Sequence, residues 1–341
     1  MKKEKLISFT VPSYNSQDYL DRCVDSLLIG GDDVEIIIVD DGSTDNTLSI
    51  AKEYEKKYPT IVKAVHQENG GHGEGVNTGL KNATGLYFKV VDSDDWLEEK
   101  ALKKLISQLK KWHQKDTNVD LVIVNYTYNH LYENITKPMR FDNIFPDNKI
   151  ISWDDIKHFN VSQYIIMHTL IYKTDILRES GLVLPKHTFY VDNLVAYQPL
   201  PYTKDICYLN IDLYQYFIGR ADQSVNEDVM IKRVDQQIRV TKLIIDSVNL
   251  NEVKSVKLKK YLIKYLSMML VISDIYLLMK KDKESLAKRT ELWNYLKDKD
   301  EKLYNKLRLR PLPGYTYFKS AFGNYISLKG YNIAKILFKF N

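Results

Sequence analysis

The chain has 341 residues, of which 44% are hydrophobic and 27% are charged, and its formal net charge is +5. This composition is typical of a globular protein with one large or two modest domains, and it excludes collagen-like, low-complexity and intrinsically disordered chains. The two cysteines, Cys23 and Cys207, form no CxxC pair. A disulfide scaffold and a cysteine-based zinc site are therefore excluded, and the cysteine usage suits a reducing compartment.

The chain shows no targeting or membrane-spanning signal. The apolar run after the N-terminal lysines is too short for a signal peptide and ends at Pro12. The most apolar window, residues 261–279, is interrupted by Lys264 and Asp274, so we expect no transmembrane helix. We therefore expect a cytoplasmic protein.

The first 125 residues alternate between short apolar runs and segments in which apolar residues recur with helical spacing. The predicted strands are 5–11, 34–39, 61–66, 86–91 and 119–124. The predicted helices are 18–28, about 44–58, 76–82 and 97–112. This alternation with short connections predicts an α/β fold, with a mostly parallel sheet and helices on both faces.

The remainder of the chain changes character twice. The pattern is broken between residues 126 and 155, and from residue 227 the apolar spacing is helical to about residue 304. We expect one domain over residues 1–226, with halves 1–125 and 126–226, followed by a mainly helical region over 227–341. From residue 225 onward there are 24 Lys and Arg against 12 Asp and Glu. This basic balance predicts an anionic partner or surface, and a solvated helical face is the alternative.

Four polar clusters follow predicted strands. They are PSYN (12–15), DDGSTD (40–45), ENGGHGEG (68–75) and DSDD (92–95). Ligands bind at the carboxyl ends of strands in open parallel sheets, so we expect one composite site, although turn and helix-cap chemistry could explain any single cluster. Adjacent Asp40 and Asp41 repel each other and need a compensating partner. The three carboxylates between residues 92 and 95 would be relieved by a hard divalent cation, unless they form only an acidic turn that caps the next helix, and Asp95 is the one best suited to that cap.

Glycine is concentrated in the third cluster and just after it. Six of the 14 glycines lie between residues 70 and 85, which indicates tight turns or close approach of the backbone to a ligand. A dinucleotide fingerprint should follow the first strand, where this chain has VPSYNS, and no GxxxxGK[ST] phosphate loop occurs.

Together the segments VPSYN, VDDGSTD, ENGGHGEGVNTGLKNATG and VDSDDW resemble the family 2 glycosyltransferases in order and spacing. The resemblance is dense over residues 5–100 and sparse between 160 and 226. It implies the A-type glycosyltransferase fold, a nucleotide-sugar donor such as a UDP-sugar, an Mn²⁺ or Mg²⁺ ion, and inversion at the anomeric carbon.

The resemblance also implies roles for individual residues. Asp40 would accept a hydrogen bond from the uracil N–H, and Asp94 would hold the metal, with Asp92 near the ribose and the metal in a DxD motif. The other implied nucleotide-binding residues are Pro12 and Tyr14 as the floor of the base pocket, Asn15, Asp41, Asn69 and Gly71.

The catalytic base of the family usually lies in a Glu-Asp pair. Here the segment YVDN carries Asp192, with Val191 where the first acid is usual. Asp192 would take the proton of an acceptor hydroxyl in a single displacement. Arg220 would pair with the leaving diphosphate. The QxxRW signature of processive members is absent, which favours single additions.

Three other functions are weighed against this one. A non-catalytic sugar-binding or nucleotide-binding module is disfavoured by Asp92, Asp94 and Asp192. A sugar nucleotidyltransferase normally needs a glycine-rich, basic loop after the first strand, and the segment VPSYNSQDY has neither glycine nor a basic residue. Nucleic-acid binding has no supporting signature in the sequence. The histidines His66, His72, His168 and His187 are more often structural than metal-bound, and among them His168 and His187 have the best claim as ligands.

The acceptor is left open between a saccharide, a lipid-linked saccharide and a glycoprotein, in cell-surface polysaccharide or glycoconjugate synthesis. The last 27 residues contain four lysines, no acid and many aromatic residues. They suit the surface of an anionic membrane, which would place the protein peripherally at the inner face. Closure of the core or a homo-oligomer interface is the alternative.

Overall fold

The computed structural model describes residues 4–219, 227–317 and 320–338. The chain divides into two compact units. The α/β unit comprises Met1–His158 and Ile165–Gly219, and the helical unit comprises Phe159–Tyr164 and Arg220–Asn341.

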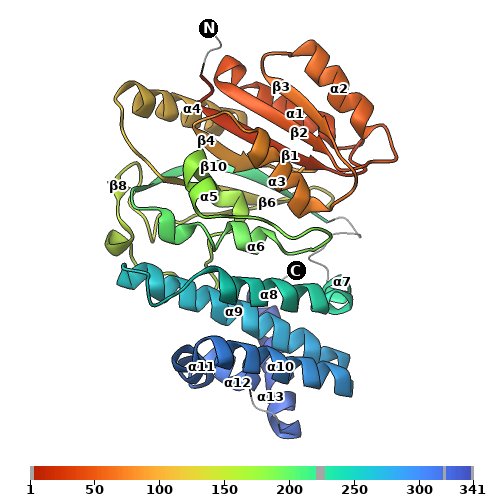
Figure 1. The fold of residues 1–341 in the computed structure, drawn as a ribbon, viewed down its shortest axis with the longest axis vertical. Coiled ribbons are helices and arrows are strands. Elements are labelled where there is room, and N and C mark those ends of the chain that lie inside the picture. The colour runs from red at the N-terminus through yellow and green to blue at the C-terminus, as the bar shows by residue number, and fades with distance from the viewer. Residues whose placement is uncertain (1–3, 220–226, 318–319, 339–341) are drawn as a thin grey trace. The chain divides into compact units, whose positions relative to one another are not determined.

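The described residues of the α/β unit form one mixed sheet of ten strands, in the order β3-β2-β1-β4-β9-β6-β10-β5, with β7 beside β6 and β8 beside β10 (Figure 1). The strands are β1 (Ile7–Ser13), β2 (Val34–Asp40), β3 (Val62–His66), β4 (Tyr87–Val90), β5 (Trp96–Leu97), β6 (Leu121–His130), β7 (Ile135–Met139), β8 (Ile150–Ile151), β9 (Leu170–Lys173) and β10 (Ile206–Ile218). The four strands β1 to β4 pair in parallel, as do β6 and β10. Strand β9 runs antiparallel between β4 and β6.

The α-helices of this unit are α1 (Leu20–Leu28), α2 (Thr47–Lys57), α3 (His72–Asn82), α4 (Glu99–Gln114), α5 (Thr174–Glu179) and α6 (Asp192–Val195). Helix α2 packs against β3, and α3 packs against β1 and β2. A Cβ atom on Gly79 would lie 1.8 Å from Oγ1 of Thr10, so only glycine lets α3 lie this close to β1. The predicted α/β sheet with helices is confirmed, but the sheet is mixed and not mostly parallel, because β5, β7, β8 and β9 pair antiparallel with their neighbours.

Several elements differ from the sequence prediction, among them β6, which continues to His130 into the region where a broken pattern was expected. Helix α3 begins at His72, one turn earlier than predicted, because the glycines at its start allow it to pack closely on neighbouring backbone. Strand β10 was not predicted, since Asn210, Asp212 and Gln215 interrupt its apolar pattern and its register with β6 shifts at Asp212.

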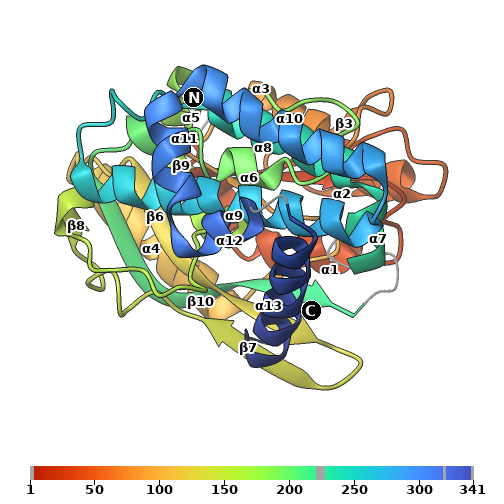
Figure 2. The same ribbon diagram turned by 90° about the horizontal axis from the view of Figure 1, so that it is seen from below.

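The helical unit contains α7 (Glu227–Lys232), α8 (Val234–Ser247), α9 (Val256–Lys280), α10 (Lys283–Lys299), α11 (Glu301–Arg308), α12 (Pro311–Tyr317) and α13 (Ala321–Phe338). Helices α8, α9 and α10 pack side by side, and α12 and α13 also contact α9 (Figures 1 and 2). The predicted helical C-terminal region is confirmed over the residues described.

Helix α9 is the centre of this unit. By length and composition it could cross a membrane, alone among the helices of the described residues, but 72% of its apolar window is buried inside the structure. Its Asp274 is fully buried and accepts a hydrogen bond from Nε1 of Trp293 at 3.0 Å, with Nε of Arg289 at 3.5 Å. Such burial is what the core helix of a folded unit shows.

Candidate active site

The polar clusters that follow β1, β2, β3 and β4 lie at one edge of the sheet. Parallel pairing places Ser13 beside Asp40, and Asp40 beside His66. Because β4 also runs parallel to β1, the acidic turn that follows it leaves the sheet at the same edge. The predicted convergence of these clusters on one edge is therefore present in the structure.

The loop after β1 is hydrogen-bonded to the loop after β2. Asn15 adopts a left-handed backbone conformation with φ of 48°, and its Oδ1 accepts a hydrogen bond from the backbone N–H of Thr44 at 2.9 Å. Pro12 is buried within β1, whereas the Tyr14 side chain is 53% exposed. Tyr14 is thus held on a fixed loop with its ring available to a ligand.

Asp40 is fully buried at the end of β2. Its Oδ2 lies 2.7 Å from Nδ1 of His66, and its Oδ1 is buried with no hydrogen-bond partner in the described part of the chain. Buried carboxylate oxygens are rarely left unpaired. Asp40 therefore offers an acceptor that a bound N–H or O–H group can satisfy.

Asp41 is also buried, but both of its oxygens are used. Oδ1 accepts hydrogen bonds from the backbone N–H of Gly70 at 2.8 Å and from Nε2 of Gln67 at 2.7 Å, and Oδ2 accepts one from the N–H of Gly71 at 2.7 Å. The side chain of Asn69 donates to the backbone oxygen of Asp41 at 2.8 Å. Asp41 and Asn69 thus shape the glycine-rich loop, and the repulsion expected between Asp40 and Asp41 is relieved by different partners.

The glycine-rich loop packs against the segment that leads to α6. Gly71 has φ of 83°, and a Cβ atom on it would lie 3.1 Å from the backbone N of His187. The N–H of His187 donates to the backbone oxygen of Gly70 at 2.7 Å. This close packing brings Asp192, at the start of α6, toward the acidic turn after β4. The glycines here serve backbone approach between two loops.

Asp95 is the buried member of the acidic turn. Its Oδ2 accepts a hydrogen bond from the Tyr214 hydroxyl at 2.5 Å, and its Oδ1 accepts one from the backbone N–H of Phe217 at 2.8 Å. The expectation that Asp95 caps the next helix is wrong, because Glu98 caps α4 by accepting from the N–H of Ala101. Asp95 instead fixes the turn to β10, a contact that sequence reasoning could not foresee without that strand.

Asp92 and Asp94 are the half-buried members of the turn. Oδ1 of Asp92 lies 2.8 Å from Nε2 of His72, and the backbone oxygen of Asp94 accepts a hydrogen bond from Arg22 at 2.6 Å. Burial alone would raise the pKa of Asp92, but the charge and hydrogen bond of His72 outweigh it and lower that pKa. Asp92 is therefore ionised at neutral pH.

Asp192 lies within electrostatic range of the same groups. Burial raises the pKa of Asp192 to about 6, the positive charge of His72 opposes this rise, and the negative charge of Asp92 adds to it. This pKa is close to the value that suits a general base near neutral pH. Residues 72, 92 and 192 thus interact although they are far apart in the sequence.

Lys89 was missed by the sequence analysis. It is 1% exposed in β4, and its Nζ donates to the backbone oxygen of His168 at 2.6 Å. Burial lowers the pKa of Lys89 to about 7, against the charges of Asp92 and Asp95. A lysine within the apolar run YFKVV was the available signal for a buried charge beside the acidic turn.

A divalent metal fits the half-buried part of the acidic turn better than its buried part. Ligand atoms of Asp92, Asp95 and His168 lie within 4.8 Å of one another. Both oxygens of Asp95 already accept hydrogen bonds, whereas Nδ1 of His168 is buried with no hydrogen-bond partner in the described part of the chain and could serve as a ligand. Asp92 and Asp94 of the turn are hard oxygen donors, as Mg²⁺ and Mn²⁺ prefer.

Three other predicted residues have different surroundings. His66 pairs with Asp40, and His187 is exposed with φ of 48° on the loop that packs against Gly71. Arg220 lies outside the described residues.

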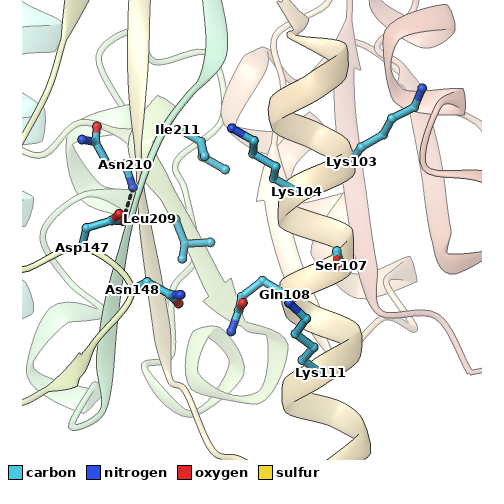
Figure 3. A pocket seen from close by; sticks show the side chains of 10 residues that line it. All are labelled: Lys103, Lys104, Ser107, Gln108, Lys111, Asp147, Asn148, Leu209, Asn210 and Ile211. Atoms are coloured by element: carbon cyan, nitrogen blue, oxygen red, sulfur yellow. Dashed lines mark hydrogen bonds between the residues drawn. The ribbon is translucent and has the colours of Figure 1, made fainter.

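A cavity of about 470 Å³ lies elsewhere on the α/β unit, between α4 and β10 (Figure 3). Lys104 and Gln108 lean from α4 toward β10, whereas Lys103 points away (Figure 3). On the side of the cavity opposite α4, the backbone N–H of Asn210 donates a hydrogen bond to Oδ1 of Asp147 (Figure 3). Its lining includes none of the predicted site residues, so we place the site at the strand ends.

The fold is that of known nucleotide-sugar enzymes. The structure is similar to the crystal structure of residues 1–349 of S. aureus TarS in complex with UDP-GlcNAc, with a TM-score of 0.69 and 20% identity over 96% of this chain and 92% of that chain. It is also similar to the mannosyltransferase PcManGT from Pyrobaculum calidifontis in complex with GDP-Man and Mn²⁺, with a TM-score of 0.54 and 15% identity over 96% of this chain and 88% of that one. The α/β unit therefore has an A-type glycosyltransferase fold.

Sequence comparison adds the family. Residues 8–174 match the family model Glycosyl transferase family 2, so the chain contains a family 2 glycosyltransferase domain. Glycosyltransferase GlyA of Streptococcus pneumoniae is 28% identical over 64% of this chain and 31% of its own length. The poly(ribitol-phosphate) beta-glucosyltransferase of Bacillus spizizenii is 31% identical over 53% of this chain and 27% of its own length. The matched region thus spans less than a third of these relatives.

Proposed function

We propose that the chain is a metal-dependent, inverting glycosyltransferase that moves one hexosyl or N-acetylhexosaminyl group from a UDP-sugar to an acceptor hydroxyl. The acceptor belongs to cell-surface polysaccharide or glycoconjugate synthesis, and the enzyme works at the inner face of the membrane. The observation that supports the proposal best is the polar site at the strand ends, where the buried Oδ1 of Asp40 has no hydrogen-bond partner in the described part of the chain and Oδ1 of Asp92 lies 2.8 Å from Nε2 of His72.

Donor binding uses the strand ends. The unpartnered Oδ1 of Asp40 accepts from the uracil N–H, and the exposed ring of Tyr14 stacks on the base above Pro12 and beside Asn15. Asn69, Gly71 and Asp41 line the nucleotide through the loop that they shape, and Arg220 pairs with the diphosphate. The TarS complex with UDP-GlcNAc supports a donor of this class.

Asp94, with Asp92, would hold Mn²⁺ or Mg²⁺, which when bound neutralises the charge that develops on the leaving diphosphate. Asp92 would also lie near the ribose of the bound donor. Asp192 takes the proton of the acceptor hydroxyl, which is a poor nucleophile until a positioned base removes it. One base without a protein nucleophile gives a single displacement, and therefore inversion.

The test is a screen of nucleotide sugars for donor hydrolysis, with and without Mn²⁺, on the full chain and on Asp94→Asn. We expect hydrolysis of a UDP-sugar that needs the metal, and loss of both Mn²⁺ binding and turnover in the variant. Asp116→Asn is the matched control, because Asp116 is exposed after α4 and far from the acidic turn. Equal turnover in all three proteins with and without EDTA would contradict the metal assignment.

A further inference from the structure

Four tyrosines form two layers on neighbouring strands. The parallel register of β6 and β10 pairs Tyr126 with Tyr214, and Tyr128 with Tyr216. Side chains two residues apart on a strand point to the same face, so both pairs lie on one face of the sheet. Tyr126 and Tyr214 are buried, whereas Tyr128 and Tyr216, nearer the carboxyl ends of the strands, are half-buried. We call Tyr128 and Tyr216 the outer tyrosine pair.

The outer tyrosine pair is held rigidly from beneath. Its two ring centroids lie 5.7 Å apart with an interplanar angle of 34°. The ring of His168 packs 4.5 Å from Tyr216 and 4.4 Å from the buried Tyr214. The Tyr126 hydroxyl donates to the Tyr128 hydroxyl at 3.3 Å. Two neighbouring rings with fixed orientation therefore stand at the end of the sheet.

The outer tyrosine pair adjoins the proposed reaction centre. The ring of His168 packs 4.5 Å from the ring of Tyr216, and a ring nitrogen of His168 lies within 4.8 Å of carboxylate oxygens of Asp92 and Asp95. Burial, together with the negative charges of Asp95, Asp92 and Asp192, raises the pKa of Tyr216 well above its usual range, so its hydroxyl stays protonated. A molecule seated on this pair would therefore lie beside the acidic turn.

The aromatic faces and hydroxyl groups of the outer tyrosine pair are suited to binding a sugar ring. The C–H faces of a pyranose ring pack on aromatic faces, and the sugar hydroxyls can pair with phenol hydroxyls at the ring tips. The carboxylate of Asp192, which is proposed to face the acceptor hydroxyl, repels a phosphate or carboxylate group placed beside it. The site thus favours an uncharged sugar ring over a polyol phosphate.

We propose that Tyr128 and Tyr216 form the acceptor subsite and hold an uncharged pyranose ring whose hydroxyl faces Asp192. This inference rests on the proposed function and narrows its acceptor to a chain that ends in a neutral pyranose.

The test measures binding of uncharged methyl pyranosides and of ribitol 5-phosphate to the full chain, in the presence of UDP and Mn²⁺, by saturation-transfer NMR. We expect at least one pyranoside to bind, and Tyr128→Ala and Tyr216→Ala each to raise its Kd by about tenfold, as loss of an aromatic contact does. Tyr128→Phe and Tyr216→Phe keep the rings and lose only the hydroxyls, so each should raise the Kd by less than its alanine counterpart. Tyr202→Ala is the matched control, because Tyr202 is 42% exposed in the short 3-10 helix Leu200–Tyr202, outside β6 and β10.

The outcomes separate this subsite from the proposed function. Metal-dependent donor hydrolysis with unchanged pyranoside binding in folded alanine variants would overturn the subsite alone. Preferential binding of ribitol 5-phosphate, or equal loss in Tyr202→Ala, would overturn it as well. Loss of pyranoside binding in the alanine variants of a chain that turns over no nucleotide sugar would support the subsite and contradict the proposed function.

Discussion

Nε2 of His72 lies 2.8 Å from Oδ1 of Asp92, which joins the first turn of α3 to the acidic turn after β4. The negative charge of Asp92 raises the pKa of His72 against the effect of burial, and the pKa of Asp92 is lowered in return. The pair thus couples the glycine-rich loop to the residues proposed to hold the metal.

This pair should stabilise the fold only in a limited pH range. The contribution of Asp92 is lost as pH falls below its ordinary pKa of 3.8, and that of His72 is lost as pH rises through its raised pKa, above 6.5. We expect His72→Gln to lower the free energy of unfolding by about 1 kcal/mol or less near pH 5.5, since His72 is 35% exposed, and by less at pH 9. Denaturant titrations at the two pH values measure this, and an effect that is equal at both would contradict it.

Asp192 should set the acid limb of the pH–rate profile. Because burial raises the pKa of Asp192 to about 6 and a general base must be deprotonated, turnover should fall about tenfold for each pH unit below 6. Asp192→Asn should cut turnover by about 10²–10⁴-fold and leave donor affinity nearly unchanged.

The matched control for Asp192 is Asp175→Asn, which makes the same chemical change on an exposed position of α5. Donor binding and turnover are measured separately in both variants. Normal turnover in Asp192→Asn would assign the base to another carboxylate, such as Asp222, which lies outside the described residues; Asp205 precedes β10, and its carboxylate accepts a hydrogen bond from Asn118.

Asp95 should matter for stability more than for chemistry. Asp95→Ala leaves the Tyr214 hydroxyl and the Phe217 N–H without their buried acceptor, and each unpaired group costs about 1–3 kcal/mol. We expect Asp95→Ala to destabilise the chain by about 2–4 kcal/mol and Asp95→Asn to cost less, because the amide oxygen still accepts one bond. Chemical unfolding of both variants checks this order, and the reverse order would be inconsistent with it.

Asp274 should make the chain less stable as pH rises. Burial raises the pKa of Asp274 to about 7 from 3.8, with Arg289 opposing, so between these values the folded state holds a proton that the unfolded state has lost. The free energy of unfolding should therefore fall as pH rises from about 4 to 7. In Asp274→Asn this dependence should be weaker, as thermal unfolding at pH 5 and pH 8 would show. The same slope in both proteins would exclude Asp274 as its source.

The sequence predicted most strands of the first half because they are short, nearly continuous apolar runs, although β6 continues past its predicted end at residue 124 to His130. Asp40, at the end of one such run, could be predicted as a site residue, and the structure leaves its Oδ1 unpaired. It could not be predicted that the adjacent Asp41 turns inward to bind the glycine-rich loop, because its partners Gly70 and Gly71 are distant in sequence. The residues on β10 were missed for a similar reason, since a strand with a register shift and polar residues has no clear period.

The last helix, α13, offers a surface for the predicted attachment to an anionic membrane. Tyr325, Ile326 and Ile333 are 56%, 42% and 57% exposed, and Nζ of Lys329 lies 5.0 Å from the ring centroid of Tyr325. Phe318, Lys319, Lys339 and Phe340, which were part of the same prediction, lie outside the described residues. Each lysine near such a surface contributes about 1 kcal/mol, and the aromatic and aliphatic side chains insert at the headgroup boundary.

We expect the chain to co-sediment with vesicles of phosphatidylglycerol and phosphatidylcholine, but not with phosphatidylcholine alone, and the binding to weaken with salt because it is electrostatic. Replacing Tyr325, Ile326 and Ile333 by serine should abolish it. Val183→Ser is the control, because Val183 is 75% exposed on the α/β unit. If the triple variant changes sedimentation velocity from dimer to monomer while neither protein binds vesicles, these side chains form an interface between copies of the chain, since their exposure would then be covered by a second copy and not by lipid.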